Sequence, residues 1–386
     1  MNIALLTASY FPEYNGAALR VHGLVEGLTP YGHKIVVLVP GTIFSREQHK
    51  HCIVYRIPVR KGLPSNIIER FTKFHWRRYR SFLRYIDSIV VREKIDIIHT
   101  RQPFDLFYVG FHIQRRFHLP WIAEAHKLLS ITDFEEKRIF SFLKNMLLHE
   151  ELRLMNKSDL VVTMTPSGEG TLREFGVTKP IVVVPNASSL PLTRNTKDRH
   201  AKKFSPYLLY VGNIRTVEGL ERLVFAFKRI LEHLPNLQLV IIGGGDRRSL
   251  EQLVRRYNLH GHIHLLGELP FNDLLPYYRH ATLFVQPRKS VRYHRDIIGL
   301  KMYDALRAGL PIATSDYGEL ATLVRNKGIG VLSHVDDTEN FADTVVALLK
   351  DKKRYATIRK RVLVHRKDFS WRASCRALDR AIRTLC

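Results

Sequence analysis

Two aspartates eight positions apart stand where a helical stretch begins in the second half of the chain. The segment is Asp296-Ile297-Ile298-Gly299-Leu300-Lys301-Met302-Tyr303-Asp304, and its helix is predicted to end at Gly309-Leu310-Pro311. Carboxylates suit sugar and ribose hydroxyls, which donate hydrogen bonds. A lysine near a helix N-terminus suits a pyrophosphate. The spacing therefore predicts hydroxyl and diphosphate contacts, and the alternative is a surface helix with incidental charges.

Glycine-containing turns between strands and helices are a second feature. Gly16-Ala17 follows the first apolar run, Gly212 ends a later one, and Gly243-Gly244-Gly245 ends the next. Small residues there let backbone N–H groups approach an anion, although the same glycines also suit tight turns without a ligand. No GxGxxG or GxxxxGK[ST] pattern occurs, which excludes the standard dinucleotide fingerprint and the P-loop.

Composition limits the class of protein. The 386 residues predict two domains, possibly three, and 45% hydrophobic with 25% charged residues excludes extensive disorder. Cys52, Cys375 and Cys386 are too few and too scattered for a disulfide framework or a zinc finger, and they favour a reducing compartment. We expect no signal peptide and, without ~18 consecutive apolar residues, no transmembrane helix.

The chain is strongly basic: 61 Lys and Arg less 36 Asp and Glu gives +25. Such an excess predicts polyanionic partners, which include nucleic acid, anionic lipid and phosphorylated substrates, or else a solvated basic surface.

Strand-like and helix-like segments alternate, which predicts an α/β protein. A strand at 3–7, a Pro/Gly loop, a helix over 18–31 and a strand at 35–39 form a βαβ unit. The continuous apolar strands predict parallel sheets covered on both faces. We expect one doubly wound domain over 1–186, a polar linker over 187–206 and a second domain over 207–369.

Further strands are predicted at 53–57, 95–99, 121–125, 160–164 and 181–184, with helices at 66–92, 135–156 and 168–175. Two similar βα halves leave a cleft at the carboxyl ends of their strands, where such sheets bind ligands.

The helical stretch 69–90 carries a basic stripe about 80° wide. The stripe and the tryptophan that borders it consist of Arg70, Lys73, Trp76, Arg77, Arg80 and Arg84. The stripe suits anionic lipid headgroups or an acceptor at a membrane surface. It also suits the phosphates of a nucleic acid. A third interpretation is the solvated face of a packed helix. No RNP motif, zinc finger or helix-turn-helix supports nucleic acid.

Several short motifs, taken in order, resemble the family 4 glycosyltransferases, which are retaining enzymes of the GT-B fold. They are the loop 11–16, Gly32-His33, Val184-Pro185-Asn186, Val211-Gly212, 242–245, Asp296 to Asp304, and Ala308-Gly309-Leu310-Pro311. The resemblance covers nearly the whole chain. It implies two Rossmann-like domains facing across a cleft, with the nucleotide-diphosphate sugar on the C-terminal domain and the acceptor on the N-terminal domain. It also implies no metal and a last helix, 370–386, that packs back on the first domain.

The resemblance also implies roles for individual residues. Asp296 and Asp304 correspond to the family's two glutamates, which contact the donor sugar and the ribose. His126 corresponds to a histidine near the transferring carbon. Lys301 would stabilise the departing diphosphate by its positive charge. The implied donor-binding residues are Gly16, Ala17, Gly212, Arg215, Gly243, Gly244, Arg288, Gly299, Leu300 and Asp304.

The chain departs from the family where an Arg and a Lys normally follow the first strand of the second domain. Asn213 and Glu218 occupy those positions, so Arg215, Lys301 and Arg288 are the candidate cations for the diphosphate. A departing diphosphate without a nearby cation would be poorly stabilised.

The resemblance thus implies sugar transfer, with retention, from a nucleotide-diphosphate sugar to a hydroxyl of a saccharide or lipid-linked acceptor in cell-surface glycan synthesis. It implies an enzyme without a cofactor at the inner face of the cytoplasmic membrane. The alternatives are a nucleotide-sugar 2-epimerase of the same fold, a non-catalytic GT-B subunit and, more distantly, a nucleic-acid binder.

Overall fold

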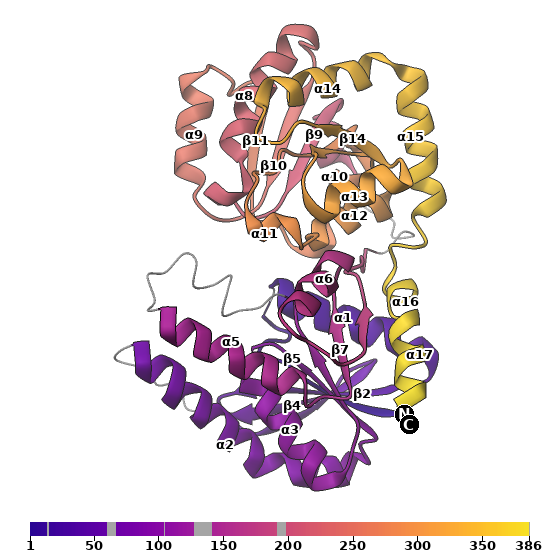
Figure 1. Ribbon diagram of the computed structural model, residues 1–386. Helices are drawn as coiled ribbons and strands as arrows, with labels where there is room; N and C mark the ends of the chain where they lie inside the picture. Colours follow the sequence, from indigo (N-terminus) through magenta and orange to yellow (C-terminus); the bar gives the residue numbers. More distant parts are fainter. Residues whose placement is uncertain (14, 60–66, 104, 127–140, 191–197, 386) are drawn as a thin grey trace. The chain divides into compact units, whose positions relative to one another are not determined.

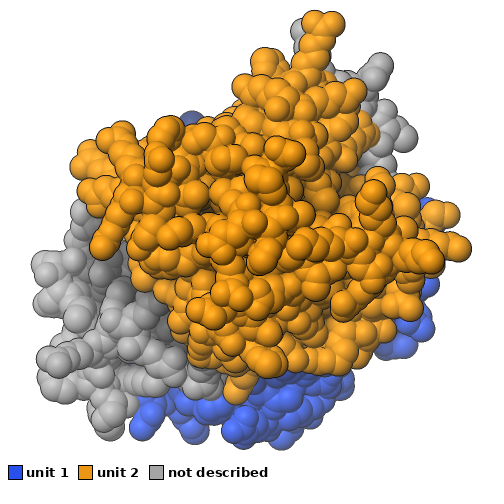
Figure 2. All heavy atoms as spheres, turned by 90° about the horizontal axis from the view of Figure 1, so that it is seen from above, with its two compact units in different colours: residues 1–185, 371–386 blue, residues 186–370 orange. Residues whose placement is uncertain are grey.

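The computed structural model describes residues 1–13, 15–59, 67–103, 105–126, 141–190 and 198–385. They divide into two compact units (Figures 1 and 2). Unit 1 consists of Met1–Pro185 together with Trp371–Cys386, and unit 2 of Asn186–Ser370.

Unit 1 is built on an eight-stranded sheet in the order β3-β4-β2-β1-β5-β6-β7-β8. Its strands are β1 (Asn2–Leu6), β2 (Lys34–Gly41), β3 (Ser45–Gln48), β4 (Cys52–Pro58), β5 (Ile97–Arg101), β6 (Trp121–Glu124), β7 (Leu160–Thr163) and β8 (Ile181–Val183). All pairs are parallel except β3 with β4. The strand order reverses between β1 and β5, so the loops that follow these two strands diverge and leave room for a ligand.

Helices cover both faces of this sheet (Figure 1). One layer holds α2 (Ile67–Glu93), α3 (Asp105–Phe117), α5 (Ser141–Met155) and α6 (Pro166–Glu174), which pack on one apolar core. The other layer holds α1 (Gly16–Leu28) with the C-terminal helices α16 (Trp371–Ser374) and α17 (Arg376–Leu385). The predicted helix at 66–92 is confirmed by α2. Strand β3 was not predicted, because its sequence, Ser-Arg-Glu-Gln, is wholly polar.

The C-terminal helices are fixed to unit 1 by packing and by polar contacts. The backbone of α1 comes so close to Trp371 that a Cβ on Gly23 would lie 1.9 Å from the indole ring. The guanidinium of Arg20 lies 5.8 Å from the centre of the same ring. Further along, His33 Nε2 lies 2.8 Å from Asp379 Oδ1. These contacts explain why residues after 370 belong with the first sheet.

Unit 2 is built on a wholly parallel six-stranded sheet in the order β11-β10-β9-β12-β13-β14. Its strands are β9 (Tyr207–Val211), β10 (Gln238–Ile242), β11 (Ile263–Gly267), β12 (Leu283–Gln286), β13 (Ile312–Ser315) and β14 (Gly330–Ser333). The order reverses between β9 and β12. The continuous apolar strands predicted a sheet covered on both faces, and this prediction is confirmed by two separate cores.

The two cores of unit 2 are completed by different helices. The first is completed by α8 (Leu220–His233), α9 (Arg247–Arg256) and α14 (Thr338–Lys350), and the second by α10 (Leu275–His280), α12 (Leu300–Ala308) and α13 (Gly318–Lys327). Helix α15 (Lys352–His365) contributes to both. The short helices α7 (Arg199–Lys202) and α11 (Arg292–Arg295) lie in connecting segments.

The segment predicted as a linker, 187–206, is assigned with unit 2. Leu190 and Phe204 belong to one of its cores, and Ala201 is fully buried. The part from 191 to 197 lies outside the described residues. The few apolar residues of this polar stretch are therefore the ones that pack.

We expect Gly23→Ala to lower the free energy of unfolding of the chain by about 1–3 kcal/mol, the usual cost of overpacking a tight contact. The reason is the 1.9 Å approach to Trp371. Thermal unfolding followed by circular dichroism would measure the loss. Gly170→Ala is the matched control in unit 1, because a Cβ there meets nothing within 4 Å. Equal stability of the two variants would contradict the packing described for α16.

Candidate functional site

The turn that follows β1 leads into the exposed N-terminus of α1. Asn15 caps this helix by accepting a hydrogen bond of 2.9 Å from the Ala18 amide. Gly16 and Ala17 are exposed, and a Cβ on Gly16 would meet nothing within 4 Å. Open space beside the first amides of a helix suits an anion.

A buried carboxylate, Glu124, lies at the carboxyl end of β6. Its Oε1 accepts hydrogen bonds from Arg20 Nε at 2.7 Å and Arg101 Nε at 3.0 Å, and its Oε2 lies 2.9 Å from His99 Nε2. Glu124 and His99 are completely inaccessible to solvent. Burial raises the pKa of Glu124, but the charges of Arg20 and Arg101 outweigh it and hold that pKa well below its usual range. Glu124 is therefore ionised.

The two arginines connect Glu124 to the rest of this edge of the sheet. Arg101 donates to the Ala17 carbonyl at 3.0 Å, and its Nη2 lies 2.7 Å from His126 Nε2. Arg20 donates to the Val184 carbonyl at 3.0 Å. This network ties the start of α1 to the ends of β5, β6 and β8.

His126 follows β6 and keeps about 23% of its side chain exposed. Its backbone amide donates to Gln102 Oε1 at 3.0 Å, and its Nε2 lies 2.7 Å from Glu124 Oε1. Burial and the charge of Arg101 lower the pKa of His126 to about 4, although Glu124 acts in the opposite direction. The imidazole is therefore neutral at pH 7. Its Nε2 is engaged by the network, which leaves Nδ1 as the ring nitrogen for a ligand.

In unit 2, the carboxylate of Asp304 is buried in the second turn of α12. Ser188 Oγ donates to its Oδ1 at 2.7 Å, and Lys301 Nζ lies 3.9 Å from its Oδ2. Burial raises the pKa of Asp304, and Lys301 and Ser188 oppose this rise without cancelling it. Lys301 also lies 5.5 Å from the centre of the Phe271 ring. Asp304 and Lys301 thus form one polar group on α12.

The N-terminus of α12 is open. Gly299 is its N-cap, Leu300 is its first residue, and a Cβ on Gly299 would meet nothing within 4 Å. Asp296 ends the preceding helix α11 and pairs with its neighbour Arg295 at 2.9 Å. The predicted helix start and the predicted end at Gly309, which adopts a left-handed conformation, are confirmed.

The glycines at the ends of β9 and β10 are explained by packing. A Cβ on Gly243 would lie 1.7 Å from the Gly212 carbonyl oxygen, and one on Gly212 would lie 2.8 Å from the Tyr210 hydroxyl. A Cβ on Gly244 would lie 3.2 Å from a carboxylate oxygen of Glu268. The close approach of these loops requires glycine at position 243 whether or not an anion binds there.

The loop after β9 carries the two residues that depart from the family pattern. Asn213 contributes its carbonyl oxygen to a hydrogen bond with Tyr210 Oη at 3.0 Å. The Glu218 side chain accepts from Arg215 Nη2 at 3.0 Å and from Gln286 Nε2 at 2.9 Å. Arg215 is thus paired within its own loop.

Arg288, predicted as a cation for the diphosphate, is buried. Its Nη1 donates to the carbonyls of His294 at 3.1 Å and Ile297 at 2.9 Å. The guanidinium therefore supports the backbone that leads to α12.

The basic stripe of α2 falls largely outside the described side chains. Those of Arg70, Lys73, Trp76 and Arg77 are not described, whereas Arg80 and Arg84 are exposed. The loop between β2 and β3 presents Ile43, 71% exposed, and Phe44, 43% exposed. The Phe44 ring stacks on Tyr85 of α2 at 4.7 Å. One exposed apolar side chain, Phe44, therefore lies against α2 at the residue that follows Arg84.

The sequence reasoning missed the residues that hold the site together. Glu124, Arg20, Arg101 and His99 were not predicted, nor was the Ser188 contact with Asp304. One signal was available: Glu124 is a charged residue inside the apolar run Trp121–Ala125, and a fully buried charge needs a partner.

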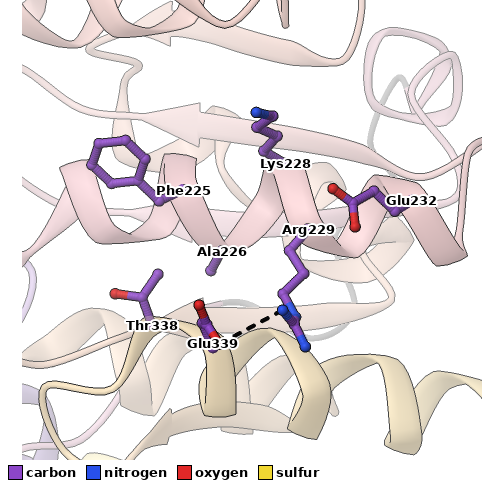
Figure 3. Close-up of a pocket in the computed structure, with 7 residues that line it drawn as sticks. All are labelled: Phe225, Ala226, Lys228, Arg229, Glu232, Thr338 and Glu339. Carbon is purple, nitrogen blue, oxygen red and sulfur yellow. Dashed lines mark ion pairs between the residues drawn. The ribbon is translucent and has the colours of Figure 1, made fainter.

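A pocket of about 350 Å³ lies between α8 and α14 (Figure 3). It is lined by Phe225, Ala226, Lys228, Arg229, Glu232, Thr338 and Glu339, with an ion pair of 3.7 Å between Arg229 and Glu339. None of the predicted donor residues lines it. Across the described residues, no cluster of three or more His, Cys, Asp or Glu side chains is arranged to hold a metal ion. In the same part of the chain, no helix has the length and hydropathy needed to span a bilayer.

Comparison with known proteins matches each half of the chain to a glycosyltransferase family model. The model of the family "Glycosyltransferase Family 4" matches residues 14–189, and that of "Glycosyl transferases group 1" matches residues 193–362. The alpha-monoglucosyldiacylglycerol synthase of Streptococcus pneumoniae is 23% identical over 352 residues, which cover 86% of this chain and 75% of the relative.

Solved structures show the same fold at low sequence identity. Sucrose-phosphate synthase from Thermosynechococcus elongatus superposes with a TM-score of 0.79 and 22% identity over 100% of this chain and 98% of its own. Anabaena HepE in complex with UDP-glucose superposes with a TM-score of 0.72 and 16% identity over 100% of both chains. The chain has the GT-B fold and belongs to family 4 of the glycosyltransferases, enzymes that use nucleotide sugar donors.

Proposed function

We propose that this protein is a metal-independent, retaining hexosyltransferase. It moves a sugar from a nucleotide-diphosphate sugar to a hydroxyl of a saccharide or lipid-linked acceptor in cell-surface glycan synthesis. The observation that supports this most is the start of α12, where the buried carboxylate of Asp304, the ammonium of Lys301 and an open helix N-terminus occur within six residues, 299–304.

The chemistry of these groups suits the two ends of a donor. The ionised form of Asp304 accepts hydrogen bonds from ribose hydroxyls, while Ser188 keeps its other oxygen in place. Lys301 and the first amides of α12 attract the diphosphate and stabilise the charge that it gains on leaving. Asp296, eight positions earlier, is the carboxylate for the hydroxyls of the sugar.

Unit 1 contributes a second set of residues to the proposal. The open amides at Gly16 and Ala17 are assigned to the diphosphate, and the neutral His126 to the transferred sugar. A neutral imidazole donates or accepts a hydrogen bond without adding charge. For retention, the acceptor hydroxyl attacks from the face that the leaving group vacates, and its proton passes to the departing phosphate oxygen.

A membrane acceptor is supported by the surface around α2. Ile43 and Phe44 are apolar and exposed, and Phe44 stacks on Tyr85, the neighbour of the exposed Arg84, a combination that suits the interface of an anionic bilayer. The Streptococcus pneumoniae relative is named for a glycosylated diacylglycerol. We therefore place the protein at the cytoplasmic face of the membrane.

We expect Asp304→Asn to lower kcat/KM for the nucleotide sugar about 10- to 100-fold, since hydrogen bonds to a charged group contribute about 1.5–3 kcal/mol. The raised pKa of Asp304 also predicts that donor binding by the wild type weakens on acidification at a higher pH than for an ordinary aspartate, and that the variant loses this dependence. Steady-state kinetics across pH would measure both effects. Asp343→Asn, which removes an exposed carboxylate paired with Arg229, is the control. Equal kinetics of the two variants would refute the assignment.

We expect the ring nitrogens of His126 to show no titration between pH 8 and pH 5, because its pKa is about 4. Nitrogen-15 NMR of the imidazole, assigned by the signal lost in His126→Asn, would follow this. A midpoint near the ordinary histidine value of about 6.5 would contradict the neutral state assigned to it.

We expect the double substitution Ile43→Ser and Phe44→Ser to weaken sedimentation with phosphatidylglycerol-containing vesicles about tenfold or more, since burial of a large apolar side chain contributes about 1.5–3 kcal/mol. Leu363→Ser with Val364→Ser is the matched control, because these neighbours are 42% and 68% exposed on α15. Equal losses in both pairs, or equal binding of the wild type to vesicles of phosphatidylcholine alone, would contradict the membrane assignment.

A further inference from the structure

The buried carboxylate of Glu218 links the loop between β9 and α8 to the neighbouring strand β12 by a hydrogen bond. This loop contains a short 3-10 turn, Thr216–Glu218, followed by Gly219 in a left-handed conformation. A Cβ on Gly219 would lie 2.6 Å from the carbonyl oxygen of Pro287, so the backbones of the two loops are in close contact. Both loops leave the carboxyl edge of the sheet where the strand order reverses.

The carboxylate of Glu218 has partners on both sides of this contact. Gln286, at the end of β12, donates to Oε2 at 2.9 Å, and His294 Nε2 lies 3.6 Å from the same oxygen. Arg215, in the loop itself, donates to Oε1 at 3.0 Å. Glu218, Gln286 and His294 are almost completely buried, so these contacts have little competition from water.

Arg215 differs from its partners because 49% of its side chain is exposed. A guanidinium has five N–H groups, so one that donates to a carboxylate still has N–H groups to offer a ligand. An exposed arginine without such a partner occupies many rotamers, and fixing one of them on binding has an entropic cost. Because Glu218 already holds the guanidinium in one position, part of this entropic cost is no longer incurred on binding.

We propose that Glu218 is a positioning residue, which holds the Arg215 guanidinium in place for the diphosphate of the donor. The proposal rests on the function proposed above and specifies how one of its cations is presented. Gln286 and His294 fix the carboxylate, the carboxylate fixes the guanidinium, and the guanidinium contacts the phosphate oxygens. The negative charge of Glu218 is compensated by Arg215 and so does not repel the donor.

Paired nucleotides test this proposal, because an effect on the diphosphate is separated from a general loss of binding. Isothermal titration calorimetry would compare UDP with UMP, GDP with GMP and ADP with AMP, and the pair that binds the wild type would be used for the variants. The readout is the preference for diphosphate over monophosphate. We expect Arg215→Gln to reduce this preference about tenfold and Glu218→Gln to reduce it by a similar factor. Combined, the two substitutions should cost no more than Arg215→Gln alone, as for residues that act as one unit.

Two controls separate positioning from folding. Arg229→Gln removes an arginine that is 41% exposed and paired with Asp343 on the pocket side of α8, and it should leave the preference unchanged. Glu218→Asp keeps the charge and should retain more of the preference than Glu218→Gln. If the glutamine variant fails to fold, Glu218→Asp is compared with the wild type and with Arg215→Gln instead, and its preference should lie between theirs.

The outcomes that contradict the proposal are distinct. An unchanged preference in Arg215→Gln would show that the guanidinium does not contact the second phosphate. A loss in Arg215→Gln without any loss in Glu218→Gln, or additive losses in the double variant, would overturn the positioning role. A wild type that binds none of the six nucleotides would instead contradict the proposed function, and this inference with it.

Discussion

A buried carboxylate is tolerated only where cations and hydrogen-bond donors replace its lost water. This constraint organises both units. In unit 1, Glu124 is completely buried, and Arg20 and Arg101 reach it from α1 and β5. In unit 2, Glu218 is nearly buried, and Gln286 reaches it from β12. Each carboxylate lies at the carboxyl edge of its sheet, so the groups that neutralise it also fix the loops of that edge.

The two clusters differ in what they present to a ligand. Around Glu124, the guanidiniums of Arg20 and Arg101 donate to groups of unit 1 itself. The side chain that this cluster presents to a ligand is the neutral imidazole of His126, which Arg101 links to the open turn at Gly16 and Ala17. Around Glu218, one guanidinium, that of Arg215, remains half exposed. Some of the arginines that give the chain its positive charge are therefore buried and stabilise the fold at the site. Others, such as Arg80 and Arg84 on α2, are exposed.

The sequence allowed the sheets and the start of α12 to be predicted, because their signals are local: apolar runs, turns, and two aspartates eight positions apart. It did not allow the clusters to be predicted. Arg20 and Glu124 are 104 positions apart, and Ser188 and Asp304 are 116 apart. Such pairs are set by the order of strands in each sheet, which periodicity does not reveal. Nor did the sequence reveal that Arg288, predicted as a cation for the diphosphate, donates to the backbone carbonyls of His294 and Ile297.

Hydrogen exchange with and without nucleotide sugars tests most directly whether the donor binds at the carboxyl edge of unit 2. UDP-, GDP- and ADP-sugars would each be added without metal, and amide protection would be followed by mass spectrometry. The account predicts that one nucleotide family protects 212–219 and 296–304 and leaves the pocket segment 225–232 unchanged. Protection confined to 225–232 and 338–339, or no protection by any donor, would contradict it.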